Sequence, residues 1–592
     1  MKKNLYLILM LLSSFAYGQT NIMVTNATAD AIMAGNYTPS TYSSGITATP
    51  SAISMDLHQS ISSDSLKDYV RQLASFGTRN TNTVSNTSTT TGLKAANAWV
   101  ENKFRQISAQ RNNRLIVSRM TFNATVCSVS KVYSQVFAVL PGTDITNKSF
   151  ILVEGHIDSR CESTCDVTCN APGVSDNATG SALVIETARV LSKYNLKATV
   201  VFLLTIGEEQ GLYGSTAFAN YTSSKGRSVR MVMNNDIAGT TLCGPCSSAP
   251  SCVAGNVANN SIRIFSYGSS NSIHKQLARY IKLEYNEQIR PVAAVPMTIN
   301  IMSAEDRTGR SSDHVPFRNK GYAAVRMISQ NENGDGSGTC GVVHSIKDNE
   351  QIDTNNDGVM DDFSVDFGYL SRNAVINANA VAMAAQSVKA PTSFTAKYVS
   401  LNKVSLTITD ASNAPGYRIA LRSLTNDWDS VYTVSTKNPT IAFVGNSSTV
   451  RYVSIAAVSA SGVESLFSGE VTVNVPATMA MNQTQGINYL ERLMRAPTSS
   501  QPGVEILKNY PNPFDESTYM VLKNESDVTY KDAYLTVRKG DGTLVERRKI
   551  SIQAGINEYL FSYKNDGRIE VFYYTFEVDD KVIATNRMMM RH

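Results

Sequence analysis

Several stretches of the chain are almost continuously apolar, and three of them end in polar residues of the kind that bind metals. These stretches begin at Ile151, Thr199 and Met231. Runs without polar alternation are typical of strands buried on both faces, as in a parallel sheet covered by helices. The ligand site of such a sheet lies beyond the carboxyl ends of its strands. The pattern therefore predicts three strands that bring His156, the pair Glu208-Glu209 and Asp236 to one crevice.

The hydrophobic pattern changes near Pro391. Strand and helix patterns alternate over residues 61–389, which predicts an α/β domain with a mostly parallel central sheet flanked by helices. Short alternating strands then predict an all-β sandwich over 390–476 and, after a linker over 477–502, a second one over 503–592. The predicted fold class is α/β, followed by two smaller all-β domains.

The N-terminus predicts export. Lys2 and Lys3 precede a short apolar stretch and then small residues up to Gly18, the pattern of a secretory signal peptide over residues 1–18. That stretch is too short to cross a membrane, and no later one is long enough. We therefore expect a secreted or cell-surface protein without a membrane span. Residues 19–60 are interpreted as an N-terminal arm, a propeptide or a linker.

Composition narrows the class of protein. A chain of 592 residues is too long for one ordinary core, which fits several domains. A net charge of +5, with 17% charged residues, gives no reason to expect a nucleic-acid partner.

The eight cysteines all lie between residues 127 and 340. In an exported chain an even number of cysteines favours disulfides, although the pairing cannot be deduced. Two alternatives stay open at this stage: zinc binding by Cys161, Cys165 and Cys169, and redox chemistry at Cys243-Gly-Pro-Cys246.

Five residues make a candidate zinc centre. A catalytic zinc needs imidazole and carboxylate ligands and an open position for water. Two zincs about 4 Å apart also need a carboxylate that bridges them. The side chains that could supply this set are His156, Asp176, Glu209, Asp236 and His344. Taken singly, each of these residues has an ordinary structural explanation, such as a core histidine, a helix cap or a solvated acid. Taken together, they predict a site for two Zn²⁺ ions.

Five motifs carry a family resemblance. They are Gly155-His156-Ile157-Asp158-Ser159, Ser175-Asp176-Asn177-Ala178-Thr179-Gly180, Gly207-Glu208-Glu209-Gln210-Gly211, Asn235-Asp236 and Val343-His344-Ser345. With these motifs in order, the chain from about residue 65 to 389 resembles the two-zinc aminopeptidases that include bacterial leucyl aminopeptidases. Glutamate carboxypeptidase and the glutaminyl cyclases are relatives of that family. The resemblance implies a zinc-exopeptidase-like fold.

The resemblance also implies how the ligands divide. Asp176 would bridge the two zincs, His156 and Asp236 would complete one coordination sphere, and Glu209 and His344 would complete the other.

Two catalytic roles follow from the same resemblance. Glu208 would be the general base, and Asp158 would hydrogen-bond the second ring nitrogen of His156. The segment around His314 is similar to one near the substrate cleft of the family, so His314 is interpreted as a pocket or oxyanion residue.

The predicted function is that of an exported aminopeptidase that cleaves N-terminal peptide bonds of peptides or proteins. Alternatives on the same scaffold are a carboxypeptidase and a single-zinc glutaminyl cyclase. A binding protein that has kept the fold without catalysis is the third possibility, and the complete ligand set with Glu208 argues against it.

A further resemblance lies directly after His344. An acidic segment follows the start of a calcium-binding loop but has Ser364 in place of the final Glu, so a structural Ca²⁺ site and an acidic turn are the alternatives. Its candidate ligands are Asp353, Asn355, Asp357 and Asp361.

The two C-terminal regions resemble known modules. Residues 451–465 are similar to the end of a fibronectin type III domain. Asn509-Tyr510-Pro511-Asn512-Pro513-Phe514 opens a region similar to the C-terminal sorting domain of the type nine secretion system, which would make that machinery a partner. A generic β-sandwich is the alternative.

Overall fold

The computed structural model describes residues 19–146, 148–336, 341–353, 359–360, 362–400, 403–412, 414–423, 427–442, 450–474, 504–506, 509, 512, 514, 516–524, 529–539, 543–564, 570–578 and 581–590. The predicted signal peptide, 1–18, and the predicted linker, 477–502, lie outside these residues. The chain divides into two compact units, the first containing most of the residues up to 473 and the second containing residues 474–592 together with 398–404 and 442–450.

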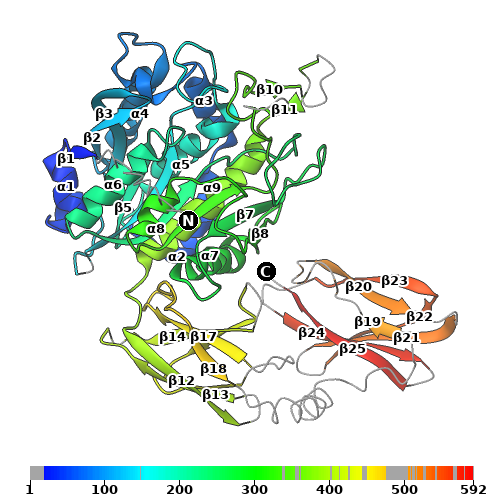
Figure 1. Ribbon diagram of the computed structural model, residues 1–592. Coiled ribbons are helices and arrows are strands. Elements are labelled where there is room, and N and C mark those ends of the chain that lie inside the picture. Colours follow the sequence, from blue (N-terminus) through cyan, green and yellow to red (C-terminus); the bar gives the residue numbers. More distant parts are fainter. Residues whose placement is uncertain are drawn as a thin grey trace, which may run out of the picture. The chain divides into compact units, whose positions relative to one another are not determined.

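A nine-stranded sheet forms the centre of the first unit (Figure 1). Its strands, in spatial order, are β1 (Thr20–Val24), β2 (Ile116–Val126), β3 (Val129–Leu140), β5 (Thr199–Thr205), β4 (Ser149–His156), β6 (Ser228–Asn235), β9 (Ala324–Ser329), β7 (Ser261–Ser266) and β8 (Thr298–Ile301). Strands β5, β4, β6 and β9 pair in parallel. Strands β1, β2, β3 and β5 pair antiparallel, as do β9 and β7. The predicted α/β fold is confirmed, with a mixed sheet whose centre is parallel.

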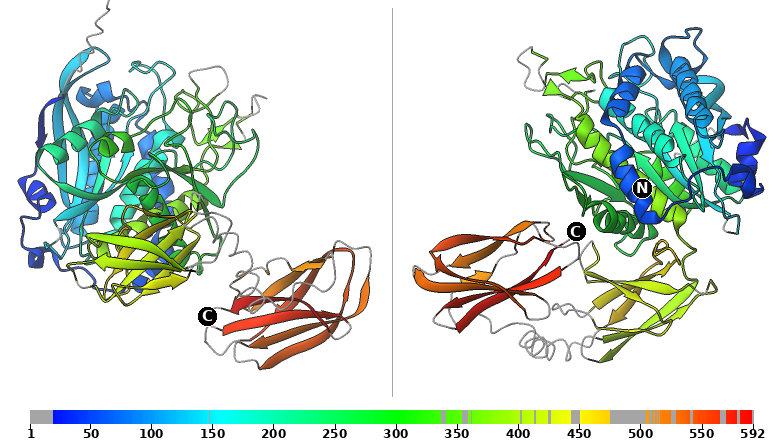
Figure 2. Two further views of the ribbon diagram at one scale, coloured as in Figure 1. Left: turned by 60° about the horizontal axis from the view of Figure 1, so that its bottom comes forward. Right: turned by 180° about the vertical axis from the view of Figure 1, so that it is seen from behind.

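Helices cover both faces of this sheet (Figures 1 and 2). The α-helices are α1 (Ala27–Met33), α2 (Pro50–Ser60), α3 (Ser63–Ala74), α4 (Gly92–Ala109), α5 (Thr179–Leu191), α6 (Tyr213–Ser224), α7 (Ile273–Glu284), α8 (His314–Asn319) and α9 (Phe367–Gln386). Four shorter helical turns are η1 (Pro39–Tyr42), η2 (Thr81–Ser85), η3 (Val174–Ala178) and η4 (Tyr285–Ile289). Helices α5 and α9 are buried almost all round and pack on each other and on β4 and β5. This burial explains why neither sequence shows a polar face.

The carboxyl ends of β4, β5 and β6 meet at one edge of the sheet. Strand β4 pairs in parallel with both of the others, with His156 opposite Thr205 of β5 and Glu154 opposite Asn234 of β6. Every residue of β4 and β5 is buried, which accounts for their continuous apolar runs. The loops that follow the three strands therefore converge, and these loops carry the candidate site.

The segment 19–60 is folded onto the α/β domain. Strand β1 pairs with β2 and becomes the outermost strand of the sheet. Ile32, Ile53 and Leu57 are buried in the same core as the central strands. Helix α2 packs against α9, which follows it by about 300 residues.

Small sheets precede and follow α9 in the sequence. Before α9, the short strands β10 (Gln351–Ile352) and β11 (Asp362–Phe363) form a two-stranded antiparallel sheet. The strands after α9 are β12 (Ser393–Ser400), β13 (Lys403–Thr409), β14 (Gly416–Arg422), β15 (Ser430–Val434), β16 (Thr440–Ala442), β17 (Val450–Val458) and β18 (Val471–Asn474), in the sheet orders β12-β13-β16 and β15-β14-β17-β18.

The C-terminal region has its own hydrophobic core, in which Phe514 packs with Phe561 and Phe572. Its strands are β19 (Val504–Ile506), β20 (Ser517–Asn524), β21 (Tyr530–Lys539), β22 (Leu544–Ile552), β23 (Gly555–Ser562), β24 (Glu570–Val578) and β25 (Lys581–Met590), in the orders β19-β20-β23 and β22-β21-β24-β25. Further small β-sheet domains after the α/β domain are thus confirmed, whereas the fibronectin type III and sorting-domain resemblances stay predictions. Over the described part of the chain, no helix combines the length and apolar character needed to cross a membrane.

Candidate metal centre

Asp176 lies between two histidines. Its Oδ1 is 3.1 Å from Nε2 of His156, and its Oδ2 is 3.1 Å from Nε2 of His344. The three side chains are at most 11% exposed. Each carboxylate oxygen therefore faces a different imidazole, which is the arrangement expected of a carboxylate shared by two metal positions.

Each half of the centre contains a second carboxylate. Oδ1 of Asp236 is 3.5 Å from Nε2 of His156, and Oε2 of Glu209 is 3.3 Å from Nε2 of His344. Two groups of potential ligand atoms result, and within each group the atoms lie within 4.8 Å of one another. The groups are His156 with Asp176 and Asp236, and Asp176 with Glu209 and His344. The structure thus brings all five candidate ligands together.

Several buried polar atoms at this centre face one another but make no well-aligned hydrogen bond among the described residues. These atoms are Nε2 of His156, Oδ1 of Asp176, Oδ1 of Asp236 and Oε1 of Glu209. Leaving such an atom unpaired costs about 1–3 kcal/mol. A divalent cation in each half of the centre would give these atoms a partner, and imidazole with carboxylate is a donor set that zinc takes. The residues present therefore fit a zinc centre.

The carboxylates of this cluster raise the pKa of both histidines. Burial lowers the pKa of His156, but Glu208 and the nearby aspartates together outweigh that effect, and the pKa is raised well above its ordinary value. Burial also lowers the pKa of His344, and Glu209 and Asp176 raise it to about 10. A cation that binds here must displace the protons of these histidines, so metal affinity falls in acid.

The backbone that carries Asp176 is held from a distant loop. The N–H groups of Ser175 and Asp176 donate to the carboxylate of Asp348 at 2.9 Å each, and the Ser175 hydroxyl donates at 2.8 Å. On the other side, Gly180 packs so closely on the main-chain oxygen of Asn235 that a Cβ atom would lie 2.1 Å from it. These contacts set the turn η3 against the end of β6.

The two carboxylate oxygens of Asp236 have different partners. Its Oδ2 accepts hydrogen bonds from the Ser312 hydroxyl at 2.7 Å and pairs with Arg326 at 2.8 Å. Arg326 also pairs with Asp306 at 2.7 Å, so the guanidinium is itself fixed. Oδ1 is left to face His156.

The second ring nitrogen of His156 bonds the main chain of the residue expected to orient it. Nδ1 lies 3.1 Å from the carbonyl oxygen of Asp158 and 3.6 Å from its carboxylate Oδ1. The other carboxylate oxygen, Oδ2, accepts from Thr81 and from the N–H of Glu209, each at 3.3 Å. Asp158 therefore supports a ligand on each side of Asp176, and it does so for His156 through its backbone.

Nδ1 of His344 has both donors and an acceptor around it. Asp335 Oδ2 is 3.2 Å away, and guanidinium nitrogens of Arg160 and Arg310 are 2.7 and 3.4 Å away. Arg160 also donates to Oε2 of Glu209 at 2.9 Å. Two arginines thus reach the half of the centre formed by Glu209 and His344.

Glu208 belongs to neither ligand group, yet it lines the same cavity as Asp176 and Asp236. Burial raises the pKa of Glu208 well above its ordinary value, and the carboxylates of Asp236 and Asp313 act in the same direction. The two adjacent glutamates therefore take different positions. Glu209 belongs to a ligand group, and Glu208 lies beside the ligands without belonging to a group.

The cavity over the centre has a volume of about 250 Å³. Its lining consists of Arg160, Asp176, Glu208, Glu209, Gly211, Leu212, Asp236, Ile237, Arg307, Gly309, Arg310, Ser311, Arg326, Val343 and His344. A buried ligand set with an open space above it and an acid at the side can bind a small polar group and exchange a proton with it.

Comparison with known proteins places the chain in a family. Residues 135–367 match Peptidase family M28. A probable zinc metalloprotease of Leptosphaeria maculans is 30% identical over 335 residues, which are 54% of this chain and 73% of that protein. The chain belongs to peptidase family M28. A probable zinc metalloprotease of Pyrenophora teres f. teres is 28% identical over 382 residues, 61% of this chain and 75% of the relative.

The solved structures that the chain matches include the LapA aminopeptidase of Legionella pneumophila, which is 16% identical to this M28 chain. The match covers 58% of this chain and 77% of LapA, with a TM-score of 0.41. Because the two relatives from Leptosphaeria maculans and Pyrenophora teres f. teres are probable zinc metalloproteases, zinc is the metal implied for the centre.

His314 takes a different place from the one expected. It begins α8, is fully buried and does not line the cavity of the M28 site. Burial lowers its pKa to about 4, so it is neutral. The same segment contributes through its serines instead, because Ser311 lines the cavity and Ser312 bonds Asp236.

Several residues of the M28 site escaped the sequence motifs. Arg160, Arg310 and Asp348 lie in loops with no periodic pattern, and their partners are distant in sequence. Arg326 does carry a signal, because it interrupts the apolar run of β9, where a cation must have a buried partner.

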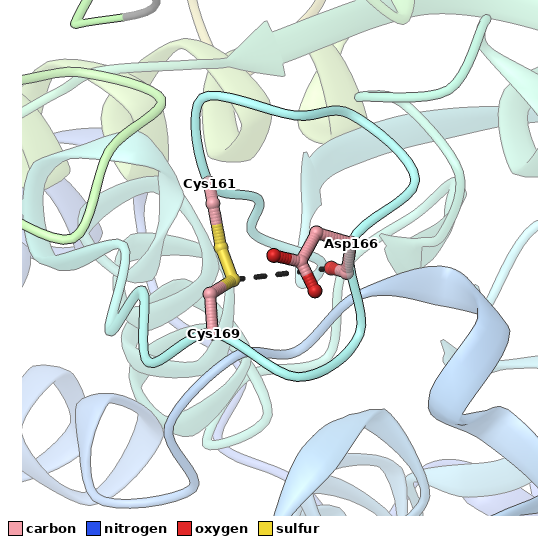
Figure 3. Close-up of side chains that lie close together, drawn as sticks. All are labelled: Cys161, Asp166 and Cys169. Carbon is pink, nitrogen blue, oxygen red and sulfur yellow. Dashed lines mark hydrogen bonds between the residues drawn. A yellow bond between two sulfur atoms is a disulfide. The ribbon is translucent and has the colours of Figure 1, made fainter.

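The cysteines of this M28 chain form disulfides. Their pairs are Cys127–Cys165, Cys161–Cys169 and Cys243–Cys252. Cys246 is also disulfide-bonded, and Cys340 lies outside the described residues. Figure 3 shows the bridge between Cys161 and Cys169, with the sulfur of Cys169 directed at the main-chain oxygen of Asp166.

This pairing corrects both alternatives for the cysteines. Bridged sulfurs are not thiolates, so Cys161, Cys165 and Cys169 do not form a zinc site. Cys243 pairs outside its Cys-Gly-Pro-Cys motif, which removes the redox interpretation.

The calcium site stays a prediction. Of its candidate ligands Asp353 is described, whereas Asn355, Asp357 and Asp361 lie outside the described residues. The segment lies between strands β10 and β11 rather than between two helices.

Proposed function

We propose that this M28 peptidase is a zinc-dependent aminopeptidase that hydrolyses N-terminal peptide bonds, with Glu208 as the general base. The observation that carries the proposal is the position of Asp176, whose two oxygens each face a different histidine, with Glu208 beside them and outside both ligand groups. This arrangement favours a hydrolase over a binding protein, because a binding site has no need of an uncommitted acid next to the ligands.

The proposal assigns two zinc ions. His156 and Asp236 would hold one, Glu209 and His344 the other, and Asp176 both. Zinc bound there would act as a Lewis acid, which polarises a peptide carbonyl and lowers the pKa of a bound water towards neutrality.

The residues of the chain supply the rest of the chemistry. Glu208 would accept a proton from the attacking water and return it to the nitrogen of the leaving amine. Asp348, Ser312 and Arg326 keep two ligands in one orientation, so little reorganisation is needed when a substrate arrives.

A panel of peptides tests this function. The purified full chain, loaded with zinc, should cleave peptides with a free N-terminus, and acetylation of that terminus should abolish cleavage. A chelator should abolish activity, zinc should restore it, and elemental analysis should find two zincs per chain.

Amidation of the C-terminus is the matched control, because it should leave cleavage by an aminopeptidase unchanged. Cleavage restricted to N-blocked peptides with a free C-terminus would instead identify a carboxypeptidase. Cyclisation of N-terminal glutamine with one bound zinc would identify a cyclase.

We also propose that the protein is exported. The disulfides support this proposal, because such bridges persist in oxidising compartments. The signal-peptide pattern over 1–18 and the resemblance of the C-terminal region to a type nine sorting domain support it as well.

N-terminal sequencing of the native protein tests export. Protein recovered from the culture medium or the cell surface should begin at Gln19. A chain that stays in the cytoplasm and retains Met1 would contradict the proposal.

A further inference from the structure

Four arginines of the described chain line the cavity of the metal centre. They are Arg160, Arg307, Arg310 and Arg326. Among the described residues, the apolar side chains of the lining are those of Leu212, Ile237 and Val343. The four carboxylates of the lining all belong to the metal centre or to Glu208, so bound zinc would offset their charge and leave that of the arginines. Such a cavity suits an anionic group better than an apolar side chain.

Two of the four arginines are part of a buried ion-pair network. Arg326 contacts Asp236 and Asp306, and Arg307 contacts Glu332 and Asp306. Their side chains are 5% exposed or less. These two guanidiniums are held in place by acids, and Arg326 positions the ligand Asp236.

The other two arginines face the cavity more openly. The side chain of Arg160 is 12% exposed and that of Arg310 is 17% exposed. Arg310 pairs with Asp335, which is itself 30% exposed, and donates to the hydroxyl of Ser248. Both guanidiniums converge on Nδ1 of His344.

Both arginines keep donors for a further acceptor. A guanidinium carries five N–H donors. Arg310 donates from Nε to Ser248 and from Nη1 to Asp335, so its Nη2 has no partner among the described residues. Arg160 reaches His344 with one N–H of its Nη2, and the second N–H of that nitrogen has no partner in the described part of the chain.

We propose that the cavity selects a substrate whose terminal residue places a carboxylate against Arg160 and Arg310. This inference rests on the proposed function, under which the carboxylate is the side chain of an N-terminal Asp or Glu. Guanidinium with carboxylate is a planar, two-bond pair that distinguishes an acid from its amide. A C-terminal α-carboxylate has the same chemistry and is the second source to be tested.

Substrate kinetics provide the test. With the zinc-loaded full chain, kcat/KM for a glutamyl substrate should exceed that for the glutaminyl analogue by about 10- to 100-fold, the range expected for hydrogen bonds to a charged group. Arg310→Gln should reduce this ratio to near one. Arg105→Gln, which removes the same charge from the exposed face of α4, is the control and should leave the ratio unchanged.

Binding gives a readout that is independent of turnover. Calorimetry with Glu208→Gln should find tighter binding of a glutamyl peptide than of its glutaminyl analogue, and Arg310→Gln in that background should remove the difference. Equal binding and equal hydrolysis of the two peptides would overturn the inference and leave the aminopeptidase function standing.

The remaining outcomes separate the two proposals. If no peptide is hydrolysed, the proposed function fails, and calorimetry alone decides whether the arginines select a carboxylate. If selection requires a free C-terminus and is lost on amidation, the carboxylate site is supported with the second source, and the aminopeptidase function is overturned.

Discussion

Glu208→Gln should lower kcat by about 10²- to 10⁴-fold while the protein keeps its zinc. Glutamine preserves the size of the side chain but cannot accept the proton of the attacking water. Glu208 lies beside the ligand groups without belonging to either, so the metal positions should be unaffected. Steady-state kinetics and elemental analysis of the same preparation measure the two effects separately.

Glu209→Gln is the comparison that makes this result specific. Glu209 belongs to a ligand group, so its change should reduce zinc content together with activity. The assignment of the general base would be wrong if Glu208→Gln kept more than about a tenth of the wild-type kcat, or if it lost metal to the same extent as Glu209→Gln.

Glu470→Gln should lower the free energy of unfolding by about 3–5 kcal/mol. Glu470 lies between Arg279 of α7, at 3.1 Å, and Arg422 at the end of β14, at 2.7 Å. All three side chains are 1% exposed or less. Without the carboxylate, two buried guanidiniums would lose the acid that lies between them. Urea denaturation followed by tryptophan fluorescence measures the loss, because Trp428 packs on Phe467 in the same unit.

A surface triad of the same composition is the control for that experiment. Glu101 also lies between two arginines, Arg105 and Arg119, at 2.6 Å from each, but it is 22% exposed. Water solvates these charges, so Glu101→Gln should cost about 1 kcal/mol or less. Equal costs for the two substitutions would show that burial does not govern the Glu470 triad.

The α/β fold could be predicted because burial on both faces leaves a clear pattern in the sequence. Strands β4 and β5 have no exposed residue, so their apolar runs are continuous and their ends are marked by the first polar side chains. His156 and Glu208 could therefore be placed at one edge of a sheet before any contact was known. The antiparallel pairing of β3 with β5 could not be predicted, because an apolar run does not encode the direction of its neighbour.

The parts of the site that escaped prediction depend on tertiary hydrogen bonds. Arg160 follows a recognisable motif by one residue, yet its contacts with Glu209 and His344 bridge 49 and 184 residues. Asp158 could be named as the partner of His156, but only the structure shows that the bond is made by its carbonyl. Ser312 lies in the segment around His314 that resembles one near the substrate cleft, but its bond to Asp236 follows only from the tertiary position of that residue.

The bonds from Asp348 to residues 175 and 176 also make the metal centre depend on an intact C-terminal part of the α/β domain. The carboxylate that orients Asp176 is synthesised 172 residues after it. A nascent chain, or one that ends before residue 348, contains the shared ligand without the group that holds it. The position of Asp176 therefore depends on two segments that lie 172 residues apart in the sequence and must fold together.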